Sequence, residues 1–154
     1  MQEIERKFLV KDTEFLKEIK GSKISQAYIF NEKTKGTLRV RIYGDQAFLT
    51  LKGKTQGISR SEFEYEIPLE DAKAMIAEFS DNQLIEKLRY EIPQKRLKWE
   101  VDVFTGKNEG LIIAEIELDS EDQEFDRPEW LGEEVSHDKR YINALLIQNP
   151  YQDW

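Results

Sequence analysis

The sequence predicts an α+β fold in which about eight antiparallel strands form a barrel or a highly curved sheet, with a few covering helices. Charged and apolar residues alternate with a period of two in many short segments, which is typical of strands that have two different faces. Apolar residues at helical spacing are confined to three short stretches. The chain has 154 residues and no low-complexity linker, so we expect a single domain over residues 1–154.

The first half of the chain contains five expected strands. In the first of them Ile4, Phe8 and Val10 share one face, and Arg6 interrupts this apolar face. The segment that contains Phe30 is apolar-rich, and the other strands alternate regularly. These five strands are expected at residues 3–10, 24–30, 37–43, 47–52 and 60–67.

The second half adds three strands and most of the helical signal. The strands are expected at residues 87–92, 97–103 and 114–118. Trp99 alternates with apolar neighbours, so we expect it outside the barrel, beneath a helix. Helices are expected at residues 70–80 after Pro68, just after Asp12, and at about 138–148.

Composition limits the class of protein. The formal net charge is −8 and the pI is about 4.9, which argues against duplex nucleic acid or an anionic membrane as the main partner. A small polyanion is compatible with this charge if the basic residues gather where it binds. The absence of cysteine excludes thiolate chemistry. No apolar run approaches the roughly 18 residues of a membrane span, and we expect a cytoplasmic protein.

The charged strand faces have two interpretations. An ordinary antiparallel sheet would turn them to water, whereas a barrel could turn them inward. Residues two apart on a strand lie roughly 6.5–7 Å apart, so like charges there repel unless an ion or ligand lies between them. Such pairs are Glu3/Glu5, Arg39/Arg41, Glu62/Glu64 and Glu115/Glu117. Paired carboxylates suit a divalent cation and paired arginines suit phosphate.

The order of these charged motifs resembles the CYTH superfamily, the triphosphate tunnel metalloenzymes. The N-terminal motif is Glu3-Ile-Glu5-Arg-Lys7. The motifs after it are Arg39-Val-Arg41, Thr50-Leu-Lys52, Glu62-Phe-Glu64, Lys87-Leu-Arg89, Glu100-Val-Asp102, Glu115-Ile-Glu117 and Asp138-Lys139-Arg140-Tyr141. The resemblance covers nearly the whole chain and implies a closed antiparallel eight-stranded β-barrel that encloses a triphosphate tunnel.

Within this superfamily the short, nearly insertion-free chain is most similar to the small bacterial inorganic triphosphatases. The resemblance implies metal-dependent hydrolysis of inorganic triphosphate to pyrophosphate and phosphate, with Mg²⁺ or Mn²⁺, and a homodimer. The alternatives are a class IV-type adenylyl cyclase, an organic triphosphatase acting on ATP or thiamine triphosphate, and a non-catalytic polyphosphate-binding module. The full set of carboxylates favours an enzyme.

The resemblance also implies the site residues. The expected metal ligands are Glu3, Glu5 and Glu117, with Glu62, Glu64 and Glu115 (and Glu100 and Asp102) available for a second ion or for orienting water. The expected phosphate contacts are Lys7, Arg39, Arg41, Lys52, Lys87, Arg89, Lys139 and Arg140. The expected catalytic residues are Lys7, Lys52, Glu64, Asp102 and Tyr28, and the last three are the candidates for the general base.

Other conspicuous residues have simpler interpretations. His137 is the only histidine, and we expect it in a surface loop. Trp130 and Trp154 are expected to cover a barrel end or to contact a second subunit. The acidic run at residues 119–124 is expected to be a solvated loop.

Overall fold

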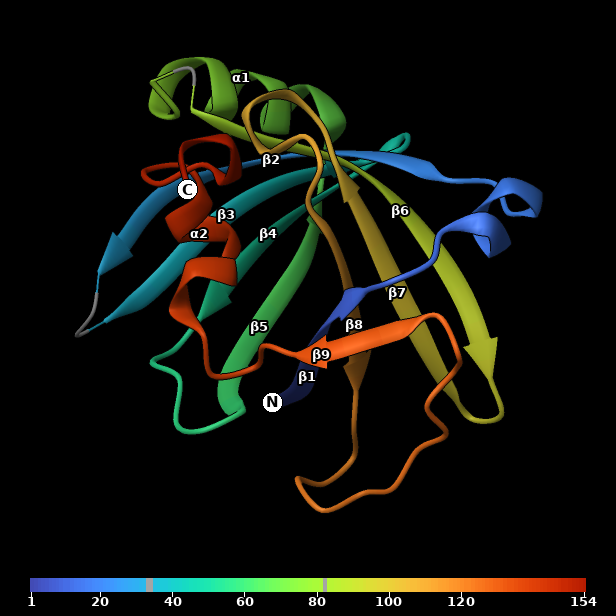
Figure 1. Cartoon of the computed structure of the whole chain (residues 1–154). Helices are drawn as coiled ribbons and strands as arrows, with labels where there is room; N and C mark the ends of the chain where they lie inside the picture. The colour runs from blue at the N-terminus through green and yellow to red at the C-terminus, as the bar shows by residue number, and fades with distance from the viewer. Residues whose placement is uncertain (33–34, 82) are drawn as a thin grey trace.

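The computed structural model describes residues 1–32, 35–81 and 83–154, and a ring of antiparallel strands dominates it (Figure 1). Within these residues the strands are β1 (Gln2–Val10), β2 (Ser22–Glu32), β3 (Gly36–Tyr43), β4 (Gln46–Lys52), β5 (Ser59–Ile67), β6 (Leu84–Gln94), β7 (Leu97–Phe104), β8 (Ile112–Glu117) and β9 (Leu131–Glu134). The first eight correspond to the eight predicted strands. The predicted α+β class and ring of eight antiparallel strands are confirmed.

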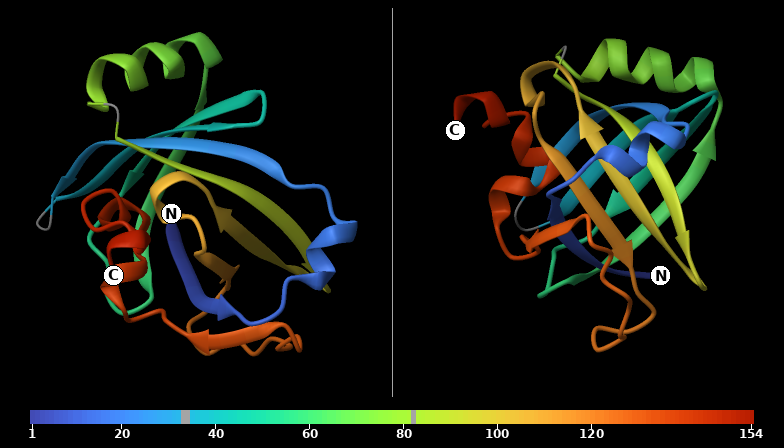
Figure 2. Two further views of the ribbon diagram at one scale, coloured as in Figure 1. Left: turned by 45° about the horizontal axis from the view of Figure 1, so that its top comes forward. Right: turned by 45° about the vertical axis from the view of Figure 1, so that its right-hand side comes forward.

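Strand β1 closes the ring (Figure 2). One of its edges pairs with β8, with Glu5 opposite Glu117 and Lys7 opposite Glu115. Its other edge pairs first with β5, where Glu3 lies opposite Arg60, and then with β9. The two ends of the sheet therefore meet at the first strand of the chain.

The apolar core lies outside the ring, because each strand turns its apolar side chains outward. One cluster contains Phe8 and Trp99, both fully buried, beneath Leu16 and the segment before β9. Phe125 and Trp130 pack edge-to-face on Trp99 at centroid distances of 5.6 and 5.5 Å. Trp99 is thus outside the ring as predicted, but a loop and a 3₁₀ turn cover it, not an α-helix.

The helical elements are shorter than the sequence predicts, except for α1 (Leu69–Phe79), which begins after Pro68 and covers Val40 and Ala47 of the sheet. The helix expected after Asp12 is a 3₁₀ turn, Glu14–Glu18. The helix expected at about 138–148 is divided into a 3₁₀ turn, Lys139–Tyr141, and α2 (Asn143–Leu146). Two further 3₁₀ turns are Gly106–Asn108 and Tyr151–Asp153.

Strand β9 was not predicted, and it explains why Arg6 interrupts the apolar face of β1. The Arg6 guanidinium donates to both carboxylate oxygens of Glu134 in β9, at 2.9 and 2.5 Å. Its charge also lies 5.1 Å from the centre of the Phe125 ring. An outward arginine is therefore accommodated because an ion pair and an aromatic ring surround it.

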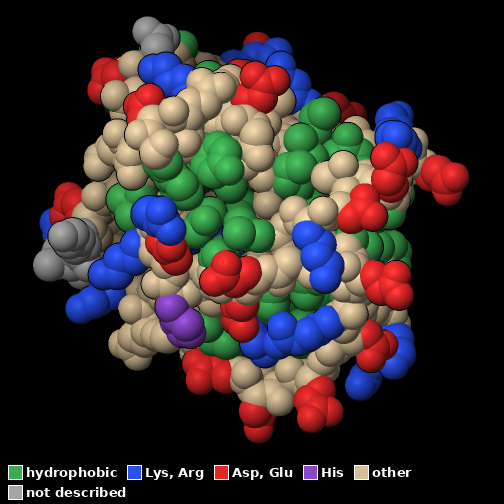
Figure 3. Space-filling view, in the orientation of Figure 1, with side chains coloured by type: hydrophobic (Ala, Val, Ile, Leu, Met, Phe, Trp, Pro, Cys, Tyr) green, Lys and Arg blue, Asp and Glu red, His purple; other side chains and the backbone are tan. Residues whose placement is uncertain are grey.

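Acidic and basic side chains are interspersed on the face shown in Figure 3. The acidic run at residues 119–124 is mostly exposed, as expected. Among the helices of the described residues, none has the length and apolar character needed to cross a membrane.

Candidate functional site

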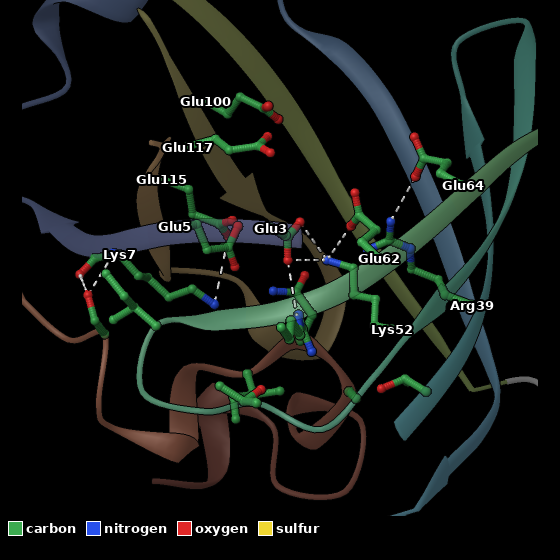
Figure 4. Close-up of a pocket in the computed structure, with 18 of the residues that line it drawn as sticks. Glu3, Glu5, Lys7, Arg39, Lys52, Glu62, Glu64, Glu100, Glu115 and Glu117 are labelled. Atoms are coloured by element: carbon green, nitrogen blue, oxygen red, sulfur yellow. Dashed lines mark hydrogen bonds and ion pairs between the residues drawn. The ribbon is translucent and has the colours of Figure 1, made fainter. Parts of the chain in front are cut away.

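The interior of the ring is a cavity of about 230 Å³ lined mainly by charged side chains (Figure 4). Seven of the 31 acidic residues and seven of the 23 basic residues line it. The acidic ones are Glu3, Glu5, Glu62, Glu64, Glu100, Glu115 and Glu117, and the basic ones are Lys7, Arg39, Arg41, Lys52, Arg60, Lys87 and Arg89. These charges balance, so the excess negative charge of the chain lies outside the cavity.

Carboxylates gather on the side of the cavity formed by β1, β7 and β8 (Figure 4). Burial and the nearby charges of Glu115 and Glu3 raise the pKa of Glu5 to about 8. Burial and the charges of Glu3, Glu62 and Glu100 likewise raise the pKa of Glu117. This side of the cavity therefore carries more negative charge than its own cations neutralise.

Glu3 is held by cations from the strands next to β1. Lys52 Nζ donates to both of its carboxylate oxygens, at 3.0 and 3.1 Å, and Arg60 Nε donates to Oε1 at 3.3 Å. Burial opposes ionisation of Glu3, but the charge of Lys52, a hydrogen bond with Glu62 and the charge of Arg60 outweigh it and lower the pKa of Glu3 to about 2. Lys52 also contacts Glu62 at 3.1 Å, and so it links the carboxylates of β1 and β5.

The opposite side of the cavity is cationic. Arg39 lies on β3, and its Nη2 donates to Thr50 and to Glu64 at 3.2 and 3.3 Å. Its Nε is buried and has no hydrogen-bond partner within the described residues. Burial, together with the charges of Arg39 and Arg89, lowers the pKa of Arg41 to about 10. Crowded guanidinium groups with an unused donor are suited to an anion that enters the cavity.

Lys87 and Arg89 of β6 share one buried counter-ion, Asp102 of β7. Lys87 Nζ lies 2.7 Å from Asp102 Oδ2, and Arg89 donates to Oδ1 and Oδ2 at 2.7 and 2.8 Å. Arg89 also pairs with Glu100. Burial would raise the pKa of Asp102, but the charges of Arg89 and Lys87 outweigh it and lower the value to about 2. Asp102 lies behind the lining, so it positions the two cations and does not face the cavity as a base or a metal ligand.

Three predicted site residues are therefore placed outside the cavity lining: Asp102, Lys139 and Arg140. Lys139 and Arg140 form a 3₁₀ turn and are exposed. Arg140 bonds to Asp138 at 2.7 Å, and its charge lies 4.8 Å from the Trp154 ring. Their turn directs both residues to solvent, and their contact with phosphate stays a prediction.

The remaining predicted residues, Tyr28 included, all line the cavity. His137 is exposed, as expected. Trp130 stacks on Phe15 at 4.4 Å and belongs to the outer core, so it does not cover an end of the ring. Trp154 packs against Tyr141 and Tyr151.

Sequence reasoning missed five polar lining residues, which are Thr37, Thr55, Arg60, Ser136 and Asn143. Arg60 could have been found, because it lies two residues before Glu62 on the same strand face. Asn143 is a neutral residue within an apolar helical pattern, and no signal in the sequence separates it from other surface amides.

The carboxylates of β1 and β8 fit a divalent cation by their chemistry. Hard oxygen ligands suit Mg²⁺ and Mn²⁺, and a cation between Glu3, Glu5 and Glu117 would relieve the repulsion that raises the pKa of Glu5 and Glu117. In the described part of the chain, no three acidic or histidine side chains are already positioned to hold an ion together. Ion binding therefore requires these side chains to turn toward one another.

The model of the CYTH domain family matches residues 1–145. The chain belongs to the CYTH family. The matched region includes β1, which closes the ring, and its partners β5 and β8. It also includes every lining residue described above.

Known CYTH relatives are similar over almost their full length. An inorganic triphosphatase of Acetivibrio thermocellus is 46% identical, and the alignment covers 99% of this chain and 97% of that protein. An inorganic triphosphatase of Nitrosomonas europaea is 39% identical over 95% of this chain and 97% of that protein. The crystal structure of the inorganic triphosphatase NE1496 superimposes with a TM-score of 0.64 at 35% identity, covering 94% of this chain and 93% of that chain.

Proposed function

We propose that this protein is a metal-dependent inorganic triphosphatase, which hydrolyses triphosphate to pyrophosphate and phosphate inside the ring. The observation that carries the proposal is the gathering of seven carboxylates and seven cations in one small cavity, with carboxylates on β1 and β8 and cations on β3 and β6 among them. Such a cavity can bind a polyanion and its divalent cation at the same time. The names of the two full-length relatives support the same activity.

In this proposal the carboxylates Glu3, Glu5 and Glu117 hold Mg²⁺ or Mn²⁺, and Glu62, Glu64 and Glu115 serve a second ion or orient water. When bound, such an ion would supply positive charge for the phosphate oxygens and would acidify a coordinated water. Lys7, Arg39, Arg41, Lys52, Lys87 and Arg89 bind the phosphate oxygens. Phosphoryl transfer depends mostly on positioning and charge stabilisation, and a cage of fixed cations supplies both.

The proton of the attacking water needs an acceptor that faces the cavity. Asp102 does not face it, and its oxygens are already bonded to Lys87 and Arg89. Glu64 faces it but also accepts from Arg39 and Thr50, at 3.3 and 2.8 Å. Tyr28 accepts from Gln26 at 2.9 Å. We propose Glu64 as the acceptor, since a carboxylate keeps a free lone pair while making these two bonds.

Inorganic triphosphate fits this lining better than a nucleotide does. Tyr28 is the only aromatic residue in the lining of the cavity among the described residues, so a purine or thiazolium ring would gain little binding energy. A ligand made only of phosphate can use every cation. Binding energy applied at the reacting group raises turnover, and so kcat/KM should be highest for the bare polyanion.

The test compares kcat/KM for inorganic triphosphate, ATP and thiamine triphosphate, with Mg²⁺ and with Mn²⁺, and identifies the products. We expect inorganic triphosphate to be preferred, with phosphate and pyrophosphate as products. Equal rates with ATP, or the formation of cyclic AMP, would show that another activity of the family applies. Binding without turnover would identify a polyphosphate-binding module.

We further infer a cytoplasmic homodimer that uses Mg²⁺ or Mn²⁺ and binds neither nucleic acid nor membrane. The net charge of −8 supports the absence of binding to nucleic acid or to an anionic membrane, because both would repel an acidic protein. Analytical ultracentrifugation tests the dimer, and the metal comparison above tests the ion.

A further inference from the structure

Asn143 reaches the cavity from the C-terminal segment and not from a strand of the ring. It is the first residue of α2, whose Leu146 packs with Ile85 of β6 and Ile113 of β8. Together with Ile142 and Ala144 it lines the cavity. A neutral amide is thus placed among the charged side chains that we propose bind triphosphate.

The orientation of this amide follows from its neighbours. Arg41 Nε donates to Gln26 Oε1 at 2.9 Å, and a guanidinium can only donate. Gln26 Nε2 is therefore the atom that faces Asn143, and it donates to Asn143 Oδ1 at 3.2 Å. Lys87 Nζ donates to the same oxygen at 2.8 Å. Two donors converge on Oδ1, so the amide cannot be turned round without losing both bonds.

Asn143 consequently connects two cations on different strands, Lys87 on β6 and, through the fully buried Gln26, Arg41 on β3. A lysine ammonium has three N–H donors. Asp102 and Asn143 accept two of those of Lys87, which leaves one for a phosphate oxygen. In the described residues the Nδ2 of Asn143 has no hydrogen-bond partner, and this leaves a neutral donor at the cavity.

We propose that Asn143 is a substrate-positioning residue, which directs Lys87 and Arg41 into the cavity through Oδ1 and offers Nδ2 to a phosphate oxygen. The inference rests on the proposed function, since it takes triphosphate as the ligand. It makes the C-terminal segment part of the phosphate-binding site.

If Asn143 positions Lys87, replacing Asn143 should change the pKa of Lys87. Burial lowers the pKa of this lysine to about 7. The charged groups that act on it are Asp102 of β7 and Glu115 of β8, which favour the ammonium, and Arg89 of β6 and Arg41 of β3, which oppose it. The Asn143 carbonyl accepts from the ammonium and favours it too. Removing this acceptor should lower the pKa of Lys87 further, whereas a carboxylate in its place should raise it.

The experiment compares Asn143→Ala and Asn143→Asp with Asn149→Asp, a matched control. Asn149 is exposed in the same C-terminal segment and does not line the cavity. The measurements are kcat/KM for triphosphate against pH, the affinity for triphosphate by calorimetry without metal, and the pKa of Lys87 by NMR of its labelled side chain. Triphosphate itself also changes protonation state with pH, but this change affects the pH profiles of all variants equally.

We expect both Asn143 variants to lose about tenfold or more in kcat/KM at neutral pH, about 1.4 kcal/mol, and to bind triphosphate more weakly. The basic limb of the pH profile and the pKa of Lys87 should move to lower pH in Asn143→Ala and to higher pH in Asn143→Asp. Asn149→Asp should match the wild type. A purely structural role for Asn143 would leave the affinity of the folded variants for triphosphate at the wild-type value.

A pKa of Lys87 that stays at the wild-type value in both variants, or moves the same way in both, would overturn the inference. If Asn143→Ala fails to fold, Asn143→Ser retains a small acceptor, and an unshifted Lys87 pKa in it and in Asn143→Asp would overturn the inference equally. Wild-type protein that does not cleave triphosphate would refute the proposed function instead. The calorimetric and NMR measurements would still decide the role of Asn143.

Discussion

Lys52 Nζ lies 3.0 Å from Glu3 Oε1, although 49 residues separate the two in the chain. The pair spans β1 and β4, with β5 between them. It therefore joins the two ends of the sheet inside the cavity, where the carboxylate side meets the cationic side.

Lys52→Met tests this pair. Loss of the ammonium should raise the pKa of Glu3, because Lys52 is the largest of the charges that lower it. We expect kcat/KM for triphosphate to fall at least about tenfold at neutral pH, about 1.4 kcal/mol of transition-state stabilisation. Lys73→Met, on the exposed side of α1, is the control and should behave like the wild type. Wild-type turnover by Lys52→Met would remove this lysine from the site.

Glu5→Gln should separate stability from activity. The pKa of Glu5 rises from 4.5 to about 8, so the folded protein binds more protons than the unfolded chain between these values. Without metal, the free energy of unfolding should therefore fall as the pH rises from about 4.5 to 8. Glutamine cannot ionise and should escape this loss, which makes the variant more stable at pH 8 in a chelator but inactive with metal.

Thermal unfolding against pH, with chelator and with Mg²⁺, measures both effects of Glu5→Gln. Mg²⁺ should raise the Tm of the wild type more than that of the variant. An equal Mg²⁺ response in the two proteins would place the ion elsewhere.

Arg39→Lys should cost far more than a conservative change usually does. The unused Nε and the Nη2 of Arg39 form a planar pair of donors, and lysine replaces it by a single point charge. We expect kcat/KM to fall at least about tenfold, measured as phosphate release from triphosphate. If activity survives in Arg39→Lys and in Arg41→Lys, phosphate is not bound on this side of the cavity.

Asp102→Asn should destabilise the protein, because Lys87 and Arg89 would lose their shared buried counter-ion. Removing one member of a buried ion pair typically costs about 3 kcal/mol or more. Urea unfolding of the metal-free protein measures this loss. Asp126→Asn breaks the exposed pair with Lys95 and should cost less than about 1 kcal/mol. Similar losses in the two variants would show that Asp102 contributes no more than a surface ion pair.

The eight ring strands could be predicted because the two faces of the ring differ so strongly in polarity. Period-two alternation could not show which face turns inward, and the resemblance to the CYTH superfamily supplied that direction. Strand β9 was missed because it has only four residues and no alternation. It is defined by contact with β1, where Gly132 lies so close that a Cβ atom would approach Leu9 O to 2.9 Å.

Most of the candidate site could be predicted from strands, because alternation fixes which side chains share a face. The predicted and missed residues that depart from the observed lining lie where alternation gives too little information. Lys139 and Arg140 belong to a 3₁₀ turn that directs them to solvent. Asp102 has the inward parity of its strand, but its short side chain is fully buried behind Lys87 and Arg89. Asn143 depends on how α2 docks against the ring, which no local pattern specifies.

The closure of the ring at β1 also sets an order for folding. Strand β1 precedes the other strands of the ring in the chain, and besides β5 it pairs with residues 113–117 and with β9, which are synthesised much later. Contacts between such distant segments form slowly, because a long loop must close before they stabilise the fold. Glu3 and Glu5 therefore meet Glu115 and Glu117 only after β8 has been synthesised. Under this order a nascent chain cannot assemble the carboxylate cluster early, and the proposed divalent-ion site would form only in a chain whose ring has closed.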